Sequence, residues 1–259
     1  MIWVFDSGFW WLQTVKYLRA QFPYEDFLFL ADTKNLPYGD KDEKTLQLLT
    51  RKNIERLLHA WCHHVVIACN TAVASIYHHW FAEDIEKRLI AVTQSAVKEI
   101  ILYNFNHIAV FCTQATHTLW VYPTIYERLG GKWVLYSIPT PEFVPLIESD
   151  VIDYESIAKY IDFYAESILP ETDCLILWCT HYPIILEMFW EKLPRLKIID
   201  PWRSAIFTLD KRLLDKQLKK DCWKWTTRVY CTWDVEKFAR GAQRLLKTKD
   251  LPQITHINF

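Results

Sequence analysis

The sequence predicts an α/β fold, arranged as two similar open α/β domains with mainly parallel sheets. Three observations predict it. Short apolar runs alternate with helix-length segments whose apolar residues recur at three- and four-residue spacing. The apolar runs are nearly continuous in valine, isoleucine, leucine and phenylalanine, which is typical of strands buried on both faces of a parallel sheet. In addition, two of the expected strands are followed by the same succession of residue types, which suggests two related domains.

The apolar runs and the periodic segments together place the expected elements. We expect strands at Ile2–Phe5, Phe27–Leu30, His64–Ala68, Leu89–Val92, His107–Phe111, Trp133–Tyr136, Cys174–Leu177, Lys197–Ile199 and Arg228–Cys231. We expect helices at Leu12–Gln21, Glu43–His59, Ser95–Tyr103, Tyr154–Ile168 and Asp234–Leu246. This alternation favours crossover helices packed on open sheets.

The shared succession appears in the segments 64–71 and 174–181. Each has a buried strand, then a cysteine, then two polar residues, then a helix-like segment. The cysteines are Cys69 and Cys179. We therefore expect each domain to end one strand in a thiol.

Composition excludes several classes of protein. The chain has 259 residues, of which 51% are hydrophobic, so a substantial core can form. Its 30 Lys and Arg balance 31 Asp and Glu, which is not the basic footprint of a nucleic-acid-binding protein. No apolar run approaches the roughly 20 residues of a membrane span, and the first residues do not resemble a signal peptide. We expect a cytoplasmic protein that binds neither nucleic acid nor membrane.

The seven cysteines do not indicate a disulfide framework or a structural zinc site. Their number is odd and no pair has C-x-x-C spacing. His59 and His63 have the spacing of a helical ligand pair, but no third ligand accompanies them, so we expect no metal. Most of the cysteines are expected to be ordinary buried thiols, namely Cys62, Cys112, Cys174, Cys222 and Cys231. Cys69 and Cys179 differ because polar residues follow each of them at a strand end.

Polar residues gather where the expected strands end. Ligands of open α/β sheets bind beyond the carboxyl ends of the strands. The segments found there are 6–8, 32–40, 69–71, 112–116 and 179–181, which are rich in hydroxyls, amides and thiols and poor in lysine. Such a set suits a small zwitterion or carboxylate held by neutral donors.

Six short blocks within about the first 200 residues resemble the signatures of the glutamate racemase family. They occur in that family's order and are Phe5-Asp6-Ser7-Gly8, Leu36-Pro37-Tyr38-Gly39, Ala68-Cys69-Asn70-Thr71-Ala72, Thr113-Gln114-Ala115-Thr116, Phe143-Val144-Pro145-Leu146-Ile147-Glu148 and Cys179-Thr180-His181-Tyr182-Pro183. Each block alone is a weak signal, whereas six in order are a strong one. From Ile199 onward the similarity is in outline only.

The resemblance implies interconversion of L- and D-glutamate without a cofactor, which in the family supplies D-glutamate for peptidoglycan of the cell wall. Two thiols, Cys69 and Cys179, would flank the substrate Cα, one as thiolate and one as thiol. Asp6 would assist Cys69, His181 would assist Cys179, and Glu148 would be a further acidic residue. Substrate binding would fall to Ser7, Pro37, Tyr38, Gly39, Asn70, Thr71, Thr116 and Thr180.

The resemblance also implies an arrangement of domains. Residues 1–92 and 201–259 would form one domain carrying Cys69, and residues 93–200 a second carrying Cys179. The site would lie in the cleft between them. Members of the family often form homodimers, and we extend that expectation to this chain.

Tryptophan stands at several positions where the family favours glycine. The chain has 13 Trp and only 5 Gly, where an average composition predicts about 18 Gly. The positions are Trp3, Trp10, Trp11, Trp120, Trp178, Trp202 and Trp233. A modified or designed sequence would explain them, and so would a decayed gene. Overpacking typically costs about 1–3 kcal/mol per site. We therefore expect the fold to be kept and the activity to be reduced or absent.

Three rival functions stay open on the sequence alone. One is a racemase of aspartate or another acidic amino acid. Another is a non-catalytic protein that keeps the fold and binds a ligand or a partner. A third is an enzyme that depends on pyridoxal phosphate, which would need a Schiff-base lysine and a phosphate cradle; no glycine-rich cradle is present.

Overall fold

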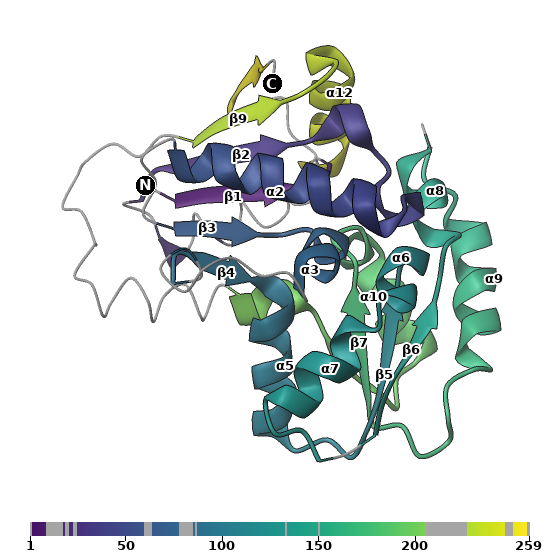
Figure 1. The fold of residues 1–259 in the computed structure, drawn as a ribbon. Helices are drawn as coiled ribbons and strands as arrows, with labels where there is room; N and C mark the ends of the chain where they lie inside the picture. Colours follow the sequence, from purple (N-terminus) through teal and green to yellow (C-terminus); the bar gives the residue numbers. More distant parts are fainter. Residues whose placement is uncertain are drawn as a thin grey trace.

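The computed structural model describes residues 2–8, 18, 21–22, 25–59, 64–77, 85, 87–132, 134–149, 151–205, 227–246 and 251–257. Its strands form two parallel sheets, which confirms the predicted fold class (Figure 1). The first sheet has six strands in the order β10-β9-β2-β1-β3-β4. Its strands are β1 (Ile2–Asp6), β2 (Phe27–Ala31), β3 (His64–Ile67), β4 (Leu89–Ala91), β9 (Thr227–Cys231) and β10 (Gln253–His256).

The second sheet has four strands in the order β6-β5-β7-β8. They are β5 (His107–Cys112), β6 (Val134–Pro139), β7 (Cys174–Trp178) and β8 (Lys197–Ile199). All pairings in both sheets are parallel, for example Val4 beside Val66 and Val110 beside Ile176. In a parallel sheet the carboxyl ends of all strands share one edge, so residues that follow different strands are brought together there.

Helices connect the strands and cover the sheets. The longer ones are α2 (Glu43–His59), α5 (Val92–Tyr103), α7 (Val121–Arg128), α9 (Tyr154–Ala165) and α12 (Val235–Leu246). The shorter ones are α3 (Asn70–Ile76), α6 (Gln114–Thr118), α8 (Phe143–Glu148), α10 (Leu186–Lys192) and the 3-10 turns η1 (Thr33–Asn35), η2 (Tyr38–Asp40) and η4 (Tyr182–Ile185). Figure 1 shows the two sheets turned across one another, with α3 and α6 between them.

The core explains why the strands are apolar on both faces. In β1, Ile2 and Val4 belong to one buried cluster, whereas Trp3 and Phe5 belong to another on the opposite face. Successive side chains of a strand point to opposite faces, so a sheet covered on both faces needs apolar residues at every position. All five residues of β1, β2 and β7 are buried.

The structure corrects several element boundaries. Val92, expected at the end of a strand, is the first residue of α5. The helix expected to reach Ile168 ends at Ala165, and the side chain of Asp153 caps its first turn by accepting from the backbone N–H of Ser156 at 3.0 Å. Strand β10 was not expected, because this edge strand lacks a continuous apolar run. The helix expected at 12–21 falls largely outside the described residues. Cys62 and Cys222 also lie outside them.

Within the described ranges, no helix has both the length and the apolar character needed to cross a bilayer.

Candidate active site

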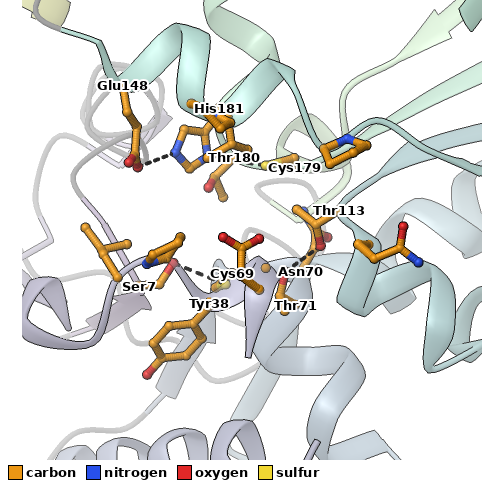
Figure 2. A pocket seen from close by; sticks show the side chains of 18 residues that line it. Ser7, Tyr38, Cys69, Asn70, Thr71, Thr113, Glu148, Cys179, Thr180 and His181 are labelled. Atoms are coloured by element: carbon orange, nitrogen blue, oxygen red, sulfur yellow. Dashed lines mark hydrogen bonds and ion pairs between the residues drawn. The ribbon is translucent and has the colours of Figure 1, made fainter. Parts of the chain in front are cut away.

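A pocket of about 250 Å³ lies where the strand ends of the two sheets meet (Figure 2). It is lined by segments that follow β1, β2, β3, β5 and β7, together with α8. The lining residues are Ser7, Leu36, Pro37, Tyr38, Gly39, Asp40, Cys69, Asn70, Thr71, Thr113, Gln114, Pro141, Val144, Pro145, Glu148, Cys179, Thr180 and His181. Residues that follow strands of both sheets therefore surround one small pocket.

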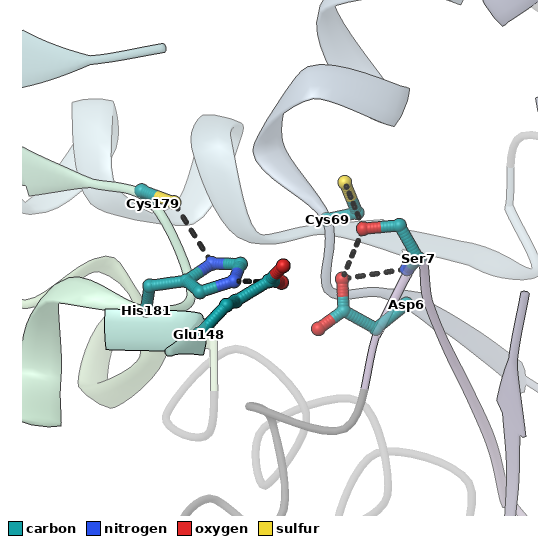
Figure 3. A network of polar contacts seen from close by, with 6 residues as sticks. All are labelled: Asp6, Ser7, Cys69, Glu148, Cys179 and His181. Atoms are coloured by element: carbon teal, nitrogen blue, oxygen red, sulfur yellow. Dashed lines mark hydrogen bonds and ion pairs between the residues drawn. The ribbon is translucent and has the colours of Figure 1, made fainter. Parts of the chain in front are cut away.

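Cys69 stands on one side of this pocket, between β3 and the first residue of α3. Its Sγ lies 3.5 Å from the Oγ of Ser7, which follows β1. The backbone N–H of Ser7 donates to Oδ1 of Asp6 at 2.8 Å. Because β1 and β3 are neighbours in the sheet, Asp6, Ser7 and Cys69 form one group at its edge (Figure 3).

Cys179 stands on the other side, directly after β7. Its Sγ lies 3.3 Å from Nδ1 of His181, and Nε2 of the same ring lies 2.9 Å from Oε1 of Glu148. Glu148 is the last residue of α8, so an acidic group from another segment orients the imidazole. Figure 3 shows this row of three residues facing the group of Asp6, Ser7 and Cys69.

Burial governs the protonation of the site. Desolvation raises the pKa of the Asp6 carboxyl to about 7, against the lowering effect of the Ser7 N–H. Desolvation, with a smaller contribution from the Asp6 charge, raises the pKa of Cys69 to about 12. Desolvation likewise raises the pKa of Cys179 well above its ordinary value, although a hydrogen bond to the His181 backbone opposes it. Both thiols are therefore protonated at neutral pH unless a positive charge or a nearby base intervenes.

Three threonines join the two sheets beside the pocket. Thr71 Oγ1 lies 3.1 Å from Thr113 Oγ1 and 3.3 Å from Thr116 Oγ1, and Thr113 donates to Thr116 at 3.0 Å. Thr71 and Thr113 line the pocket, whereas Thr116 is 1% exposed and lies behind them. From the sequence, Thr116 rather than Thr113 was expected to bind the substrate. The position of Thr113, first after β5, was the signal that could have found it.

The structure places most of the other expected site residues at the pocket. Ser7, Pro37, Tyr38, Gly39, Asn70, Thr71, Thr180 and Glu148 line it together with His181 and both thiols. Asp6 does not line it, because it is fully buried behind Ser7. Asn70 is held by Tyr122, whose hydroxyl donates to Asn70 Oδ1 at 3.2 Å. Gln114 and the apolar wall formed by Val144 and Pro145 also line the pocket and were not expected from the sequence.

The tryptophans at expected glycine positions differ in their surroundings. Trp178 is fully buried, and its ring centroid lies only 2.8 Å from that of Tyr122. Aromatic pairs ordinarily pack with centroids about 4.5–7 Å apart, so these two rings are crowded. Trp120 has φ of 49°, a left-handed conformation that a bulky residue rarely adopts. Trp233 is 57% exposed, whereas Trp10 and Trp11 lie outside the described residues.

No trio of His, Cys, Asp or Glu placed to hold a metal ion occurs among the residues that the structure describes. None of the residues found to line the pocket is a lysine or an arginine. A ligand here would meet neutral hydroxyl and amide donors, two thiols, one imidazole and acidic groups from Glu148 and Asp40.

Comparison with known proteins shows which family the chain belongs to. The chain is 32% identical to a glutamate racemase of Persephonella marina over 82% of each chain. It is 30% identical to a glutamate racemase of Lactobacillus helveticus over 95% of this chain and 93% of the relative. The chain belongs to the glutamate racemase family. No family model matches the sequence.

Solved structures agree with that membership. A glutamate racemase from Francisella tularensis, crystallised in complex with D-glutamate, has a TM-score of 0.89 and 28% identity. The match covers 99% of this chain and 97% of that one. The structure of a glutamate racemase isoform from Bacillus anthracis also gives a TM-score of 0.89, covering 100% of this chain and 97% of that one; at 22% identity it supports the fold alone. Glutamate racemases are isomerases, so this chain is grouped with enzymes rather than with binding proteins.

Proposed function

We propose that this chain interconverts L- and D-glutamate by proton transfer between two cysteines, without a cofactor. The observation that supports this most directly is that Cys69 and Cys179 line the same pocket from opposite sides. Inverting a stereocentre requires removing the α-proton from one face and returning a proton to the other. Two groups on opposite faces of Cα meet this requirement, whereas a single base does not reach both faces.

Each thiol has its own route for the proton. On one side, His181 can accept the proton of Cys179 through Nδ1, while Glu148 stabilises the resulting imidazolium at Nε2. On the other side, Asp6 is the nearby base, and Ser7 contacts both the Asp6 carboxylate and Cys69. A carboxyl with a pKa of about 7 is half ionised near neutral pH, which suits proton exchange in both directions.

The substrate itself supplies part of the driving force. Burial disfavours a thiolate at Cys69 or Cys179, because an isolated negative charge is poorly solvated there. The α-ammonium of bound glutamate would bring a positive charge next to the thiols and lower their pKa values. A thiolate would then form mainly in the substrate complex, so the reactive species would be confined to productive encounters.

Substrate recognition is assigned to neutral donors around the pocket. Ser7, Asn70, Thr71 and Thr180 present hydroxyl and amide groups, and Gly39 contributes backbone where the loop comes close to Thr113. A β-carbon at Gly39 would lie 3.1 Å from Cβ of Thr113, so the loop packs tightly there. Aspartate is the rival substrate, and it would have to reach the same donors with one methylene fewer.

The division into domains supports the same mechanism. We assign residues 1–92 and 201–259 to one domain because β1, β2, β3, β4, β9 and β10 share a sheet. We assign 93–200 to the other because β5 to β8 share the second sheet. Relative motion of the domains would open and close the pocket between the thiols. D-glutamate for peptidoglycan, a cytoplasmic location and a homodimer complete the proposal on family grounds.

The test is α-proton exchange into deuterated water from each glutamate enantiomer. Cys69→Ser and Cys179→Ser should each abolish racemisation, and any residual exchange should be confined to opposite enantiomers in the two variants. Cys174→Ser is the matched control, because that buried thiol lies at the amino end of the strand that leads to Cys179. Aspartate is assayed in parallel and should exchange much more slowly.

Two results would overturn the proposal. One is exchange that survives in Cys69→Ser and Cys179→Ser as it does in the control. The other is absence of exchange both in the chain and in a variant carrying glycine at all seven of the tryptophan positions named above. Exchange in the glycine variant alone would support the two-thiol mechanism and show that the tryptophans impair it.

A further inference from the structure

A buried carboxylate outside the pocket collects hydrogen bonds from several segments. Asp32 follows β2 and is 2% exposed. Its Oδ2 accepts from the hydroxyl of Tyr38 at 2.7 Å and from Nδ2 of Asn53 at 3.0 Å. Its Oδ1 accepts from Thr232 at 2.9 Å, and Asn35 donates to both oxygens at 3.0 Å. One side chain thus connects β2, η2, α2 and the segment after β9.

The pocket loop depends on this connection. Leu36, Pro37, Tyr38 and Gly39 form one wall of the pocket. The Tyr38 side chain is 2% exposed, and Figure 2 shows its ring directed away from the space between Cys69 and His181. Its hydroxyl is engaged by Asp32, with Asn53 donating to it at 3.4 Å. The Tyr38 hydroxyl therefore anchors the loop from behind and does not face a ligand.

We propose that Asp32 is a positioning residue that holds the wall Leu36–Gly39 in place for the substrate through Tyr38. This inference rests on the proposed function of the pocket. Neutral donors surround the carboxylate, and all of them need an acceptor. An amide in its place would present a donor to Tyr38 or Asn53, so at least one buried donor would lose its partner and the loop would shift.

Asp32→Asn and Tyr38→Phe test this positioning role. We expect Asp32→Asn to raise KM for glutamate by about tenfold or more while kcat changes by less than about threefold, because loosening a wall weakens binding of the ground state and the transition state alike. Tyr38→Phe removes one hydrogen bond and should raise KM by a smaller factor. Asp42→Asn is the matched control. Asp42 is an exposed aspartate that accepts from the N–H and hydroxyl of Thr45 before α2, so its loss should leave KM unchanged.

The outcomes separate the two proposals. An unchanged KM in Asp32→Asn together with a lowered melting temperature would show a structural role only and would overturn the positioning role. The positioning role would also be overturned if Asp32→Asn and Asp42→Asn raised KM equally. If the parental chain is inactive, the glutamate dissociation constant from calorimetry replaces KM, with the same expected ratio. Absence of both exchange and binding would instead overturn the proposed function.

A second inference has independent support, from the tryptophans. Among the described residues other than glycine, Trp120 and Asn104 alone have positive φ, and asparagine tolerates that conformation far better than tryptophan. Trp178 is crowded against Tyr122. The indole N–H groups of Trp3, Trp178 and Trp202 are buried and have no hydrogen-bond partner in the described part of the chain. A residue without a side chain would remove each of these conflicts.

We infer that the working protein has glycine at positions 3, 120, 178 and 202. One codon accounts for such an exchange, because UGA is read as tryptophan in some genetic codes and as glycine in others. The composition agrees, since 13 Trp and 5 Gly depart from average usage in opposite directions. Trp190 is different: it lies half exposed in helix α10, where glycine would weaken the helix.

The codons of the gene and peptides of the protein made in its own cells test this inference. We expect UGA at the codons for positions 3, 120, 178 and 202, UGG at the codon for Trp190, and glycine in the corresponding peptides by mass spectrometry. UGG at the four positions, or peptides carrying tryptophan there, would overturn it.

Discussion

Replacing Trp178 by alanine tests directly whether the tryptophans overpack the site. Trp178 is the last residue of β7 and is fully buried. Truncating a well-packed buried tryptophan or phenylalanine to alanine ordinarily costs about 3–5 kcal/mol of the free energy of unfolding. At Trp178 two gains offset that loss. Relief of overpacking is worth about 1–3 kcal/mol, and removal of a buried indole N–H without a partner is worth about 1–3 kcal/mol.

The two gains together, about 2–6 kcal/mol, are as large as the expected loss. We therefore expect Trp178→Ala to leave the free energy of unfolding nearly unchanged. Phe189→Ala is the matched control, because Phe189 is also fully buried against the same sheet. Its ring centroid lies 5.7 Å from that of Phe143, which is an ordinary separation. Phe189→Ala should lose the full amount of about 3–5 kcal/mol.

The assay is urea denaturation of both variants beside the parental chain. Trp178→Ala should be at least about 2 kcal/mol more stable than Phe189→Ala, which corresponds to a difference of about 4–8 °C in melting temperature. A double-mutant cycle with Tyr122→Ala adds a second reading. Removing Tyr122 should cost less when Trp178 is present than when it is already alanine, since only the intact pair is crowded.

The crowding also connects to the site. Tyr122 donates to Asn70, which lines the pocket beside Cys69. Relaxing the Tyr122 ring should therefore raise the rate of α-proton exchange while the free energy of unfolding stays nearly unchanged. The reasoning about overpacking would be refuted if Trp178→Ala lowered the free energy of unfolding as much as Phe189→Ala does and did not raise the exchange rate.

Three further predictions concern charge and capping. Burial raises the pKa of Asp6 from 3.8 to about 7. Between these two pH values the folded state keeps a proton that the unfolded state has released. The free energy of unfolding should therefore fall by up to about 4 kcal/mol as pH rises from about 4 to 7. Asp6→Asn should flatten that slope in denaturation curves taken across this range. Glu148→Gln should slow exchange at least about tenfold by removing the carboxylate charge beside His181 Nε2, whereas the exposed Glu187→Gln should not. Asp153→Ala should cost about 1 kcal/mol in urea denaturation by removing the cap of α9, and an unchanged midpoint would count against that cap.

The parallel sheets were predictable because the signal for a strand buried on both faces is local. Continuous apolar runs marked β1, β2, β3, β5 and β7 to within about a residue at each end. The short helices α6, α8 and α10 were missed because five to seven residues are too few to show a helical period. Edge strand β10 was missed because its residues are largely exposed and its pattern is mixed.

The pocket was only partly predictable for a related reason. Asp32 was recognised as a polar residue after a strand, yet its side chain turns away from the pocket toward Thr232, a residue from the far end of the chain. Nothing in the local sequence distinguishes such an anchor from a ligand-binding residue. The local sequence likewise does not distinguish Thr113 from Thr116. Thr113 lines the pocket, whereas Thr116, one helical turn farther along the chain, lies behind the pocket wall.

By itself, the sequence determined which buried apolar segments form strands and that a cysteine followed by polar residues ends two of them. Those properties depend on neighbours in the chain, so a single sequence carries them. Only the tertiary structure decided that Cys69 and Cys179 line one pocket, that His181 lies between Cys179 and Glu148, and that Trp178 meets Tyr122. Those outcomes depend on how two sheets are packed against each other, and burial by distant segments sets both the pKa values of the thiols and the room left for each ring.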